Sequence, residues 1–309
     1  MNTAVIASVT YLSSAFTYAR EHRWASFGLG LGLVSVAVLL GQSLSVIASG
    51  AIPEGLAYAV YGGLAGFATT TLGASVALSI RKIPQKLEDS LLGLAAGMML
   101  AAAAFSLILP GLEAGVELTG GRFSGAFLVV GGMALGVLLM LGLDAFAPHE
   151  HDSTGPCGPA PECCSRMWLF VMAMAIHNLP EGMAVGVAFG QADFSVGIPM
   201  ATAIALQDIP EGLAVALALR AIGLSPMKAV MVAGVSGALE PLGALLGVTL
   251  ASGMAFAYPL AMGLAAGAMI FVVSHEVIPE THRNGHQTAA TMGLMSGFAV
   301  MMVLDTALA

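Results

Sequence analysis

The chain has 309 residues, of which 58% are hydrophobic and only 9% are charged, and its formal net charge is −8 at pH 7. About a quarter of the residues in a soluble domain are charged, so this composition excludes an ordinary soluble protein and indicates a chain that crosses a membrane. The negative charge also argues against nucleic acid as a partner.

Apolar segments follow one another along almost the whole chain. A transmembrane helix needs about 20 apolar residues, because the hydrocarbon core of a bilayer is roughly 30 Å thick. The segments that meet this requirement are 27–49, 56–80, 90–112, 123–146, 167–189, 196–219, 229–254, 258–279 and 288–308. They predict an all-α polytopic membrane protein with an N-terminal segment at 1–26, one extra helix at 27–49 and eight core helices over 56–309.

Lys and Arg residues predict the orientation of these helices. With nine spans and a cytoplasmic N-terminus, all ten Lys and Arg residues except Arg122 lie on one face. Loops rich in Lys and Arg face the cytoplasm. We therefore expect a cytoplasmic N-terminus, a cytoplasmic loop at 147–166 and an external C-terminus.

The predicted cytoplasmic loop is rich in metal-ligating residue types. His149 and His151 are candidates for metal capture, although a flexible, solvated loop explains them as well. The cysteines of the chain also lie there, at Cys157, Cys163 and Cys164. Thiols that face the cytoplasm stay reduced, so we expect no disulfide framework.

The core spans also repeat. GLAAGMML at 93–100 recurs as GLAAGAMI at 263–270, with six of eight positions identical. The spans GGMALGVLLMLGLD at 131–144 and MGLMSGFAVMMVLD at 292–305 both end in aspartate. In the assigned topology, the members of each pair run in opposite directions. The sequence therefore predicts a 3+2+3 inverted repeat, which is typical of transporters that bind substrate near the membrane midplane.

Polar residues interrupt the two central spans at mid-depth. HNLPEG at 177–182 and QDIPEG at 207–212 each place a polar residue four positions before a glutamate, so the two side chains share a helix face. The proline of each motif lacks an amide hydrogen and is expected to kink the helix, which exposes carbonyl oxygens. A kinked helix with a hydrogen-bonded acid would explain one such motif, but two motifs on neighbouring spans favour a binding site.

A third span contributes Glu240, in GALEPLGA. Together with Glu181, Asp208 and Glu211 it gives four acids near the midplane, which would cost on the order of 10 kcal/mol if unpaired. No Lys or Arg lies at that depth, so the counter-charge must be protons or a cation. Imidazole nitrogen combined with carboxylate and amide oxygens suits zinc and its first-row neighbours.

At these motifs the sequence resembles the ZIP (Zrt-, Irt-like) family of divalent metal transporters. HNLPEG and QDIPEG match its fourth- and fifth-span motifs and SGALEPLGA its sixth; the resemblance covers about 56–309 and is strongest to the bacterial GufA-like branch. It implies uptake of zinc, with cadmium as a second candidate, across a bacterial inner membrane into the cytoplasm. The ligands that it implies are His177, Asn178, Glu181, Gln207, Asp208, Glu211 and Glu240. Two features depart from the family pattern: the span at 27–49, and the pair Gln207 and Asp208, where many relatives have His and Asn. The second departure leaves the metal preference open.

Several further residues are candidates for the ion pathway. Asp89, Asp144, His275 and Glu276 are expected in the cytoplasmic thirds of their spans, and Asp305 near the external end. Acids that reach the membrane interface explain them equally well. Glu54, in a third P-E-G motif, is expected to be a solvated turn residue.

The number of ligands predicts a binuclear site. A first-row dication takes four to six ligands, so seven side chains exceed what one ion needs. Four carboxylates balance two dications. No phosphate-binding GxxxxGK[ST] motif is present, so we expect alternating access without ATP, and no organic cofactor. A metal-gated or metal-selective channel or sensor remains the alternative, and a homodimer remains open. A zinc protease is excluded because HEVIPE at 275–280 lacks the second histidine of H-E-x-x-H.

Overall fold

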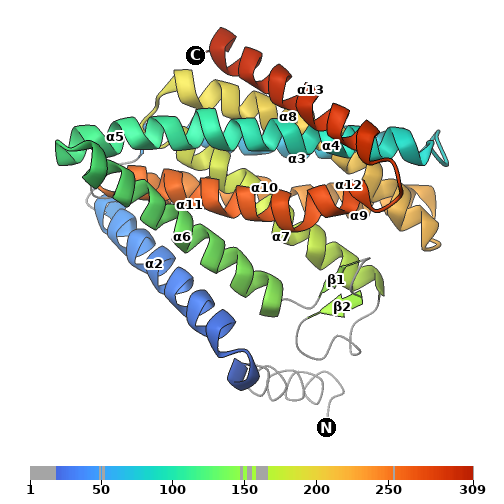
Figure 1. Cartoon of the computed structure of the whole chain (residues 1–309), viewed down its shortest axis with the longest axis horizontal. Coiled ribbons are helices and arrows are strands. Elements are labelled where there is room, and N and C mark those ends of the chain that lie inside the picture. Colours follow the sequence, from blue (N-terminus) through green and yellow to red (C-terminus); the bar gives the residue numbers. More distant parts are fainter. Residues whose placement is uncertain are drawn as a thin grey trace.

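The structure, a computed structural model, describes residues 19–48, 50, 53–146, 149–151, 155–157, 166–252 and 255–308. Helices dominate this part of the chain (Figure 1). In order they are α2 (Arg23–Ala48), α3 (Leu56–Val76), α4 (Gln85–Ala102), α5 (Leu109–Thr119), α6 (Arg122–Phe146), α7 (Arg166–Ala188), α8 (Phe194–Ala221), α9 (Pro226–Gly237), α10 (Leu239–Ala251), α11 (Ala257–Val272), α12 (Ile278–His282) and α13 (Gln287–Leu308). The π-helical segments η1 (Ala103–Ile108) and η3 (Val273–Val277) join α4 to α5 and α11 to α12.

Seven helical stretches in the described residues are long and apolar enough to cross a membrane. They are Arg23–Gln42, Gln85–Thr119, Arg122–Phe146, Phe194–Ala221, Pro226–Ala251, Ala257–His282 and Gln287–Leu308. The predicted spans at 56–80 and 167–189 are helical as α3 and α7 but are not among these seven. The chain is therefore a multi-pass membrane protein, and the count of nine spans stays a prediction.

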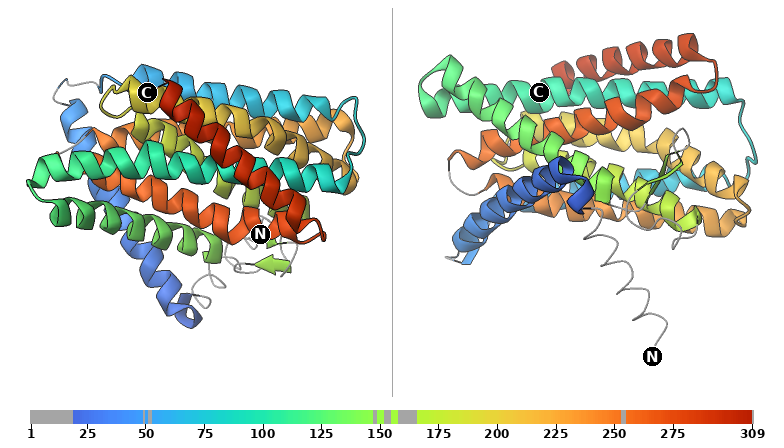
Figure 2. Two further views of the ribbon diagram at one scale, coloured as in Figure 1. Left: turned by 45° about the horizontal axis from the view of Figure 1, so that its top comes forward. Right: turned by 60° about the horizontal axis from the view of Figure 1, so that its bottom comes forward.

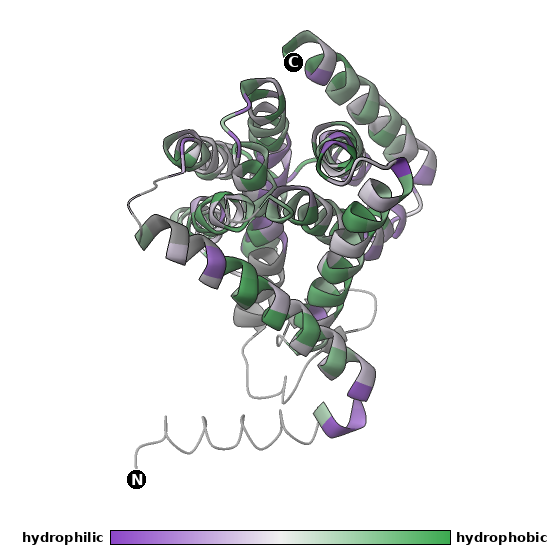
Figure 3. Cartoon of the chain, turned by 90° about the vertical axis from the view of Figure 1, so that its left-hand side faces the viewer, coloured by the Kyte–Doolittle hydropathy of each residue, from purple (hydrophilic) through white to green (hydrophobic). Residues whose placement is uncertain are grey.

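Most of the helices run side by side along the long axis of the molecule (Figure 2). Seen from one end, they are coloured mainly as hydrophobic (Figure 3). The N-terminal helix α2 lies at the periphery against α6, where Gly32 packs on Leu139 and Gly142 packs on Leu29. The segment predicted as an extra helix therefore packs outside the helices that carry the acidic residues.

Glycines bring two pairs of helices into backbone contact. The pairs are α4 with α13 and α11 with α6. A Cβ atom at any of these glycines would overlap a backbone carbonyl oxygen of the facing helix: Gly93, Gly97, Gly293 and Gly297 in the first pair, and Gly132, Gly136, Gly263 and Gly267 in the second. Helices in a membrane pack through small residues in this way, because van der Waals contact replaces the hydrophobic effect as the driving force.

Both π-helical segments follow a copy of the repeated GLAAG sequence at the same distance. The segment η1 begins ten residues after Gly93, and η3 begins ten residues after Gly263. Each π-segment is in turn followed by a proline, Pro110 or Pro279, at the start of the next helix. Single π-turns inserted in α-helices are frequent at functional sites.

The structure adds detail to two predictions about regular structure. The predicted span at 229–254 is found as one apolar stretch, Pro226–Ala251, with a turn at Ala238 between α9 and α10. Pro241 contributes to this turn, since it has no amide hydrogen to donate to the carbonyl of Gly237. The chain is also not purely helical: β1 (His149–His151) and β2 (Gly155–Cys157) form an antiparallel hairpin in the 147–166 loop, with His149 opposite Cys157.

Candidate metal centre

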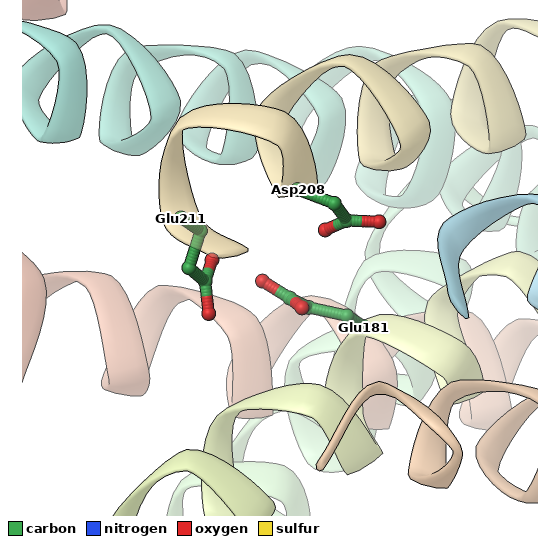
Figure 4. Close-up of side chains that lie close together, drawn as sticks. All are labelled: Glu181, Asp208 and Glu211. Atoms are coloured by element: carbon green, nitrogen blue, oxygen red, sulfur yellow. The ribbon is translucent and has the colours of Figure 1, made fainter. Parts of the chain in front are cut away.

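Three carboxyl groups converge where α7 and α8 meet. Glu181 of α7 and Asp208 and Glu211 of α8 each offer an oxygen, and these oxygens lie within 4.8 Å of one another. Figure 4 shows the three side chains turned toward a common centre. Glu181 and Asp208 are each only 1% exposed. Like charges this close in a buried place repel strongly unless a cation or protons neutralise them.

The P-E-G motifs place these acids without breaking their helices. Pro180 and Pro210 both lie inside continuous helices, α7 and α8. Glycine follows each glutamate and allows a neighbouring backbone to come close: a Cβ atom at Gly182 would overlap the carbonyl oxygen of Glu240, and one at Gly212 would overlap that of Thr70. The motifs thus bring α10 against α7 and α3 against α8.

A buried amide ties the two central helices together. Gln207 Nε2 of α8 donates to Glu181 Oε1 of α7 over 2.8 Å. Gln207 is completely buried. The bond takes up one oxygen of Glu181, so the second oxygen and the amide oxygen of Gln207 are free to act as ligands.

Glu240 of a third helix, α10, lies next to the acidic cluster. It lies in the first turn of α10, next to the break at Ala238, where the helix dipole favours a negative charge. Thr70 Oγ1 of α3 donates to Glu240 Oε1 over 2.9 Å. The other oxygen lies beside Gly66, where an added Cβ atom would overlap Glu240 Oε2 and would lie 3.0 Å from Asp208 Oδ2. Glu240 therefore adjoins the Asp208 side of the cluster.

Several buried polar atoms of this cluster have no hydrogen-bond partner among the described residues. They are Asn178 Nδ2, Glu181 Oε2, Gln207 Oε1, Asp208 Oδ2 and Glu240 Oε2. An unsatisfied buried polar group costs about 1–3 kcal/mol, and a charged one costs more. Four of the five atoms are oxygens. A donor set of this kind fits a divalent cation.

His177 lies at the edge of the cluster rather than among the three carboxylates. Its Nε2 atom is 2.9 Å from Glu276 Oε2 of η3. The histidine side chain is 13% exposed and the glutamate side chain 9%. Sequence reasoning assigned Glu276 to a separate pathway, and the structure places it in contact with a predicted ligand.

The remaining pathway candidates fall into three places. His275 Nε2 of η3 is 3.7 Å from Asp144 Oδ2 at the end of α6. Asp305 accepts a hydrogen bond of 2.5 Å from Ser106 Oγ of η1. Asp89 lies apart from both, in a cluster with hydrogen bonds from Gln85, Asn284 and His286.

Three sets of residues considered in the sequence analysis lie outside this centre. His149 and His151 lie in β1, and metal capture by them stays a prediction. Cys163 and Cys164 lie outside the described residues. Glu54 is an exposed turn residue before α3, as predicted.

Sequence reasoning missed the contributions of α3 and η1. Thr70, Gly66 and Ser106 all lie in apolar stretches, and neither their spacing nor their residue types distinguish them from ordinary packing residues. Their contacts are to residues more than 130 positions away along the chain. Only the packing of distant helices reveals them.

Comparison with known proteins identifies a matching family and several relatives. The family model described as "ZIP Zinc transporter" matches residues 150–305. The zinc transporter ZIPB of Bordetella bronchiseptica is 58% identical over 290 residues, which are 94% of each chain. The zinc transporter GufA of Myxococcus xanthus is 42% identical over 245 residues, covering 79% of this chain and 96% of that protein. Human zinc transporter ZIP11 is 31% identical over 323 residues, covering 77% and 94%.

Proposed function

The chain belongs to the ZIP zinc transporter family, and we propose that it carries Zn²⁺ across a bacterial inner membrane into the cytoplasm through the site between α7, α8 and α10. The curated relatives are named zinc transporters, which favours a transporter over an enzyme. Cd²⁺ is a second substrate in this proposal, because it accepts the same imidazole, carboxylate and amide ligands.

The observation that carries the proposal is the concentration of buried acid without a basic residue. Glu181, Asp208 and Glu211 lie within 4.8 Å of one another, and Glu240 adjoins them. Two dications would neutralise four carboxylates, whereas one dication would leave a net negative charge of two or require two protons. This balance favours a binuclear site.

The two ions would occupy different positions in this proposal. The transport position uses the His177 side, with Glu181, Gln207 and Glu211. The accessory position uses the Asn178 side, with Asp208 and Glu240. Glu181 and Glu211 lie centrally and can bridge the ions. The buried oxygens of Glu181, Gln207, Asp208 and Glu240 that have no hydrogen-bond partner in the described chain support this division.

We propose alternating access built on a 3+2+3 inverted repeat. The halves α3–α6 and α9–α13 share the position of a π-segment and reciprocal glycine contacts, and both observations favour a repeat. The central helices α7 and α8 lie between the two halves in the sequence and carry most of the site residues. Such repeats allow one bundle to move against another around a fixed midplane site. The sequence has no ATP-binding motif, so we propose transport without nucleotide.

A route to the cytoplasm would lead from the site through η3. His177 contacts Glu276, and the next residue along η3 toward α11, His275, lies near Asp144 at the end of α6. Asp305, held by Ser106, would lie near the external entrance. The positive-inside bias supports this orientation, with a cytoplasmic N-terminus and an external C-terminus.

Uptake into proteoliposomes tests the proposal. Purified chain is reconstituted without nucleotide, and Zn²⁺ entry is followed with an enclosed fluorescent indicator. We expect saturable Zn²⁺ uptake that added Cd²⁺ inhibits, while empty liposomes show none. A requirement for ATP would contradict the proposal. Non-saturating flux with single-channel events would favour the metal-selective channel instead.

A further inference from the structure

Helix α3 carries no acid, yet one of its faces lines the acidic cluster. Gly66 and Thr70 are four residues apart on this face and both are buried. Thr70 Oγ1 donates to Glu240 Oε1 over 2.9 Å, and Gly66 lies beside the second oxygen of the same carboxylate. Both residues therefore act on Glu240, which lies 170 positions further along the chain.

We propose that Thr70 is a positioning residue for the accessory metal position and that Gly66 leaves the space that the ligating oxygen Oε2 of Glu240 occupies. Thr70 fixes the Glu240 carboxylate so that Oε2 faces Asp208 Oδ2, and a divalent cation binds between these two oxygens. The inference rests on the proposed binuclear site. It adds a fourth helix, α3, to that site and assigns roles to two residues that are not among the proposed ligands.

The hydroxyl of Thr70 has the right capacity for this role. A threonine hydroxyl donates one hydrogen, so it holds one carboxylate oxygen and leaves the other for a metal. The free oxygen, Glu240 Oε2, and Asp208 Oδ2 are both buried without a hydrogen-bond partner in the described part of the chain. A hydrogen bond from outside the ligand shell fixes the orientation of a ligating carboxylate and raises metal affinity.

The neighbouring threonines of α3 donate their hydrogen bonds to different acceptors. Thr69 donates to the carbonyl oxygens of Ala65 and Gly66, and Thr71 donates to that of Phe67. A hydroxyl in a helix commonly bonds back to its own backbone in this way. Thr70 instead reaches across to a carboxylate of α10, which distinguishes it from a residue that satisfies only its own helix.

Gly66 is needed because it has no side chain, and not because its backbone adopts a conformation that only glycine favours. Its backbone is helical, and a Cβ atom there would overlap Glu240 Oε2 and approach Asp208 Oδ2 to 3.0 Å. A glycine inside a helix is about 0.5–1 kcal/mol less favourable than alanine. Glu240 Oε2 occupies the space that the missing side chain leaves, so Gly66 allows this oxygen to lie near Asp208 Oδ2.

Counting bound metal in the purified full-length chain tests this inference. Cd²⁺ bound per chain is measured against free Cd²⁺ by equilibrium dialysis and elemental analysis. The variants are Thr70→Val, which keeps the shape but loses the hydroxyl, Thr70→Ser, which keeps the hydroxyl, and Gly66→Ala. Thr69→Val is the matched control on the same helix.

We expect wild type, Thr70→Ser and Thr69→Val to bind two ions with similar affinities. Thr70→Val should weaken the second ion by about 10–100-fold and leave the first unchanged, which is the usual effect of losing an outer hydrogen bond to a metal ligand. Gly66→Ala should remove the second ion, because the added methyl group would displace the Glu240 carboxylate that binds it. Thermal unfolding without metal reports whether each variant is folded.

Two results would overturn the role of α3. One is a Thr70→Val protein that binds both ions with wild-type affinity. The other is a Thr70→Val protein in which metal-free stability and both affinities fall together while Thr70→Ser fails to restore them, because this would make Thr70 a packing residue. A wild-type chain that binds one ion at saturation would contradict the binuclear proposal itself, and the two failures are therefore distinguishable.

Discussion

The two halves of the molecule, α3–α6 and α9–α13, share a backbone plan but carry different polar residues. In each half a helix is followed by a second helix interrupted by a π-segment and by a third that carries an aspartate near its end. Thr70 lies 23 residues before the repeated GLAAG sequence in the first half, and Glu240 lies 23 residues before it in the second. The same place thus holds a hydroxyl in one half and a carboxylate in the other, and the two side chains bond to each other.

The two π-segments also carry different polar residues. In the first half, η1 provides Ser106 to Asp305 of α13, and in the second half, η3 provides His275 near Asp144 of α6. Similar packing therefore supports neutral groups on one side and acidic or imidazole groups on the other. The comparison teaches that similar backbone positions in the two halves carry polar groups of different identity, and we propose that this difference distinguishes the two routes to the site.

The membrane faces on which Asp144 and Asp305 lie give the clearest test of this comparison. Cysteines replacing Asp144 or Asp305, in a chain without its three native cysteines, should react with an impermeant thiol reagent from opposite faces of the membrane. The reason is that inverted halves place equivalent residues on opposite sides. Labelling from the same side would contradict both the topology and the inverted repeat. Labelling of intact and of permeabilised cells gives the measurement.

Glu181→Gln should have the largest effect on transport, because it removes the central carboxylate of the cluster. We expect Zn²⁺ uptake in proteoliposomes to fall more than about 100-fold, since removing a ligand exceeds the usual effect of removing its outer partner. Glu54→Ala is the matched control, as Glu54 is an exposed acid in the third P-E-G motif. An equal loss in both variants would show that the 52–57 segment also serves transport.

His177→Ala should have the next largest effect and tests whether the two central helices are equivalent. His177 and Gln207 hold corresponding places in HNLPEG and QDIPEG, but only the imidazole contacts Glu276. We expect uptake to fall about tenfold or more through loss of a nitrogen ligand, with weaker metal binding. Isothermal titration with Zn²⁺, alongside uptake, makes the measurement. Wild-type binding and uptake in a folded variant would show that His177 is not a ligand.

Local sequence patterns predicted the helices, the midplane acids and their association into one region. Each of these depends on hydrophobic runs, proline and i,i+4 spacing, which act within a few residues. Proline alone did not predict the turn at Ala238, because Pro180 and Pro210 lie inside continuous helices whereas Pro241 follows a turn between α9 and α10.

Contacts between distant helices could not be predicted in the same way. The Thr70–Glu240 hydrogen bond and the His177–Glu276 contact join residues 170 and 99 positions apart. Which face of α3 or η3 turns toward the site depends on glycine-mediated packing of whole helices, and no local period encodes it. The short β-hairpin was missed because three-residue strands leave almost no pattern in a polar loop.

The central claim is that the midplane site holds two ions, one on the His177 side and one on the Glu240 side. Anomalous scattering from crystals of the wild-type chain saturated with Cd²⁺ tests it most directly. We predict two peaks, one among Glu181, Asp208 and Glu211 and one between Asp208 and Glu240, and a single peak in Glu240→Ala, which should keep measurable transport. A single ion in the wild type under saturating metal, with Glu240 far from it, would contradict the binuclear account.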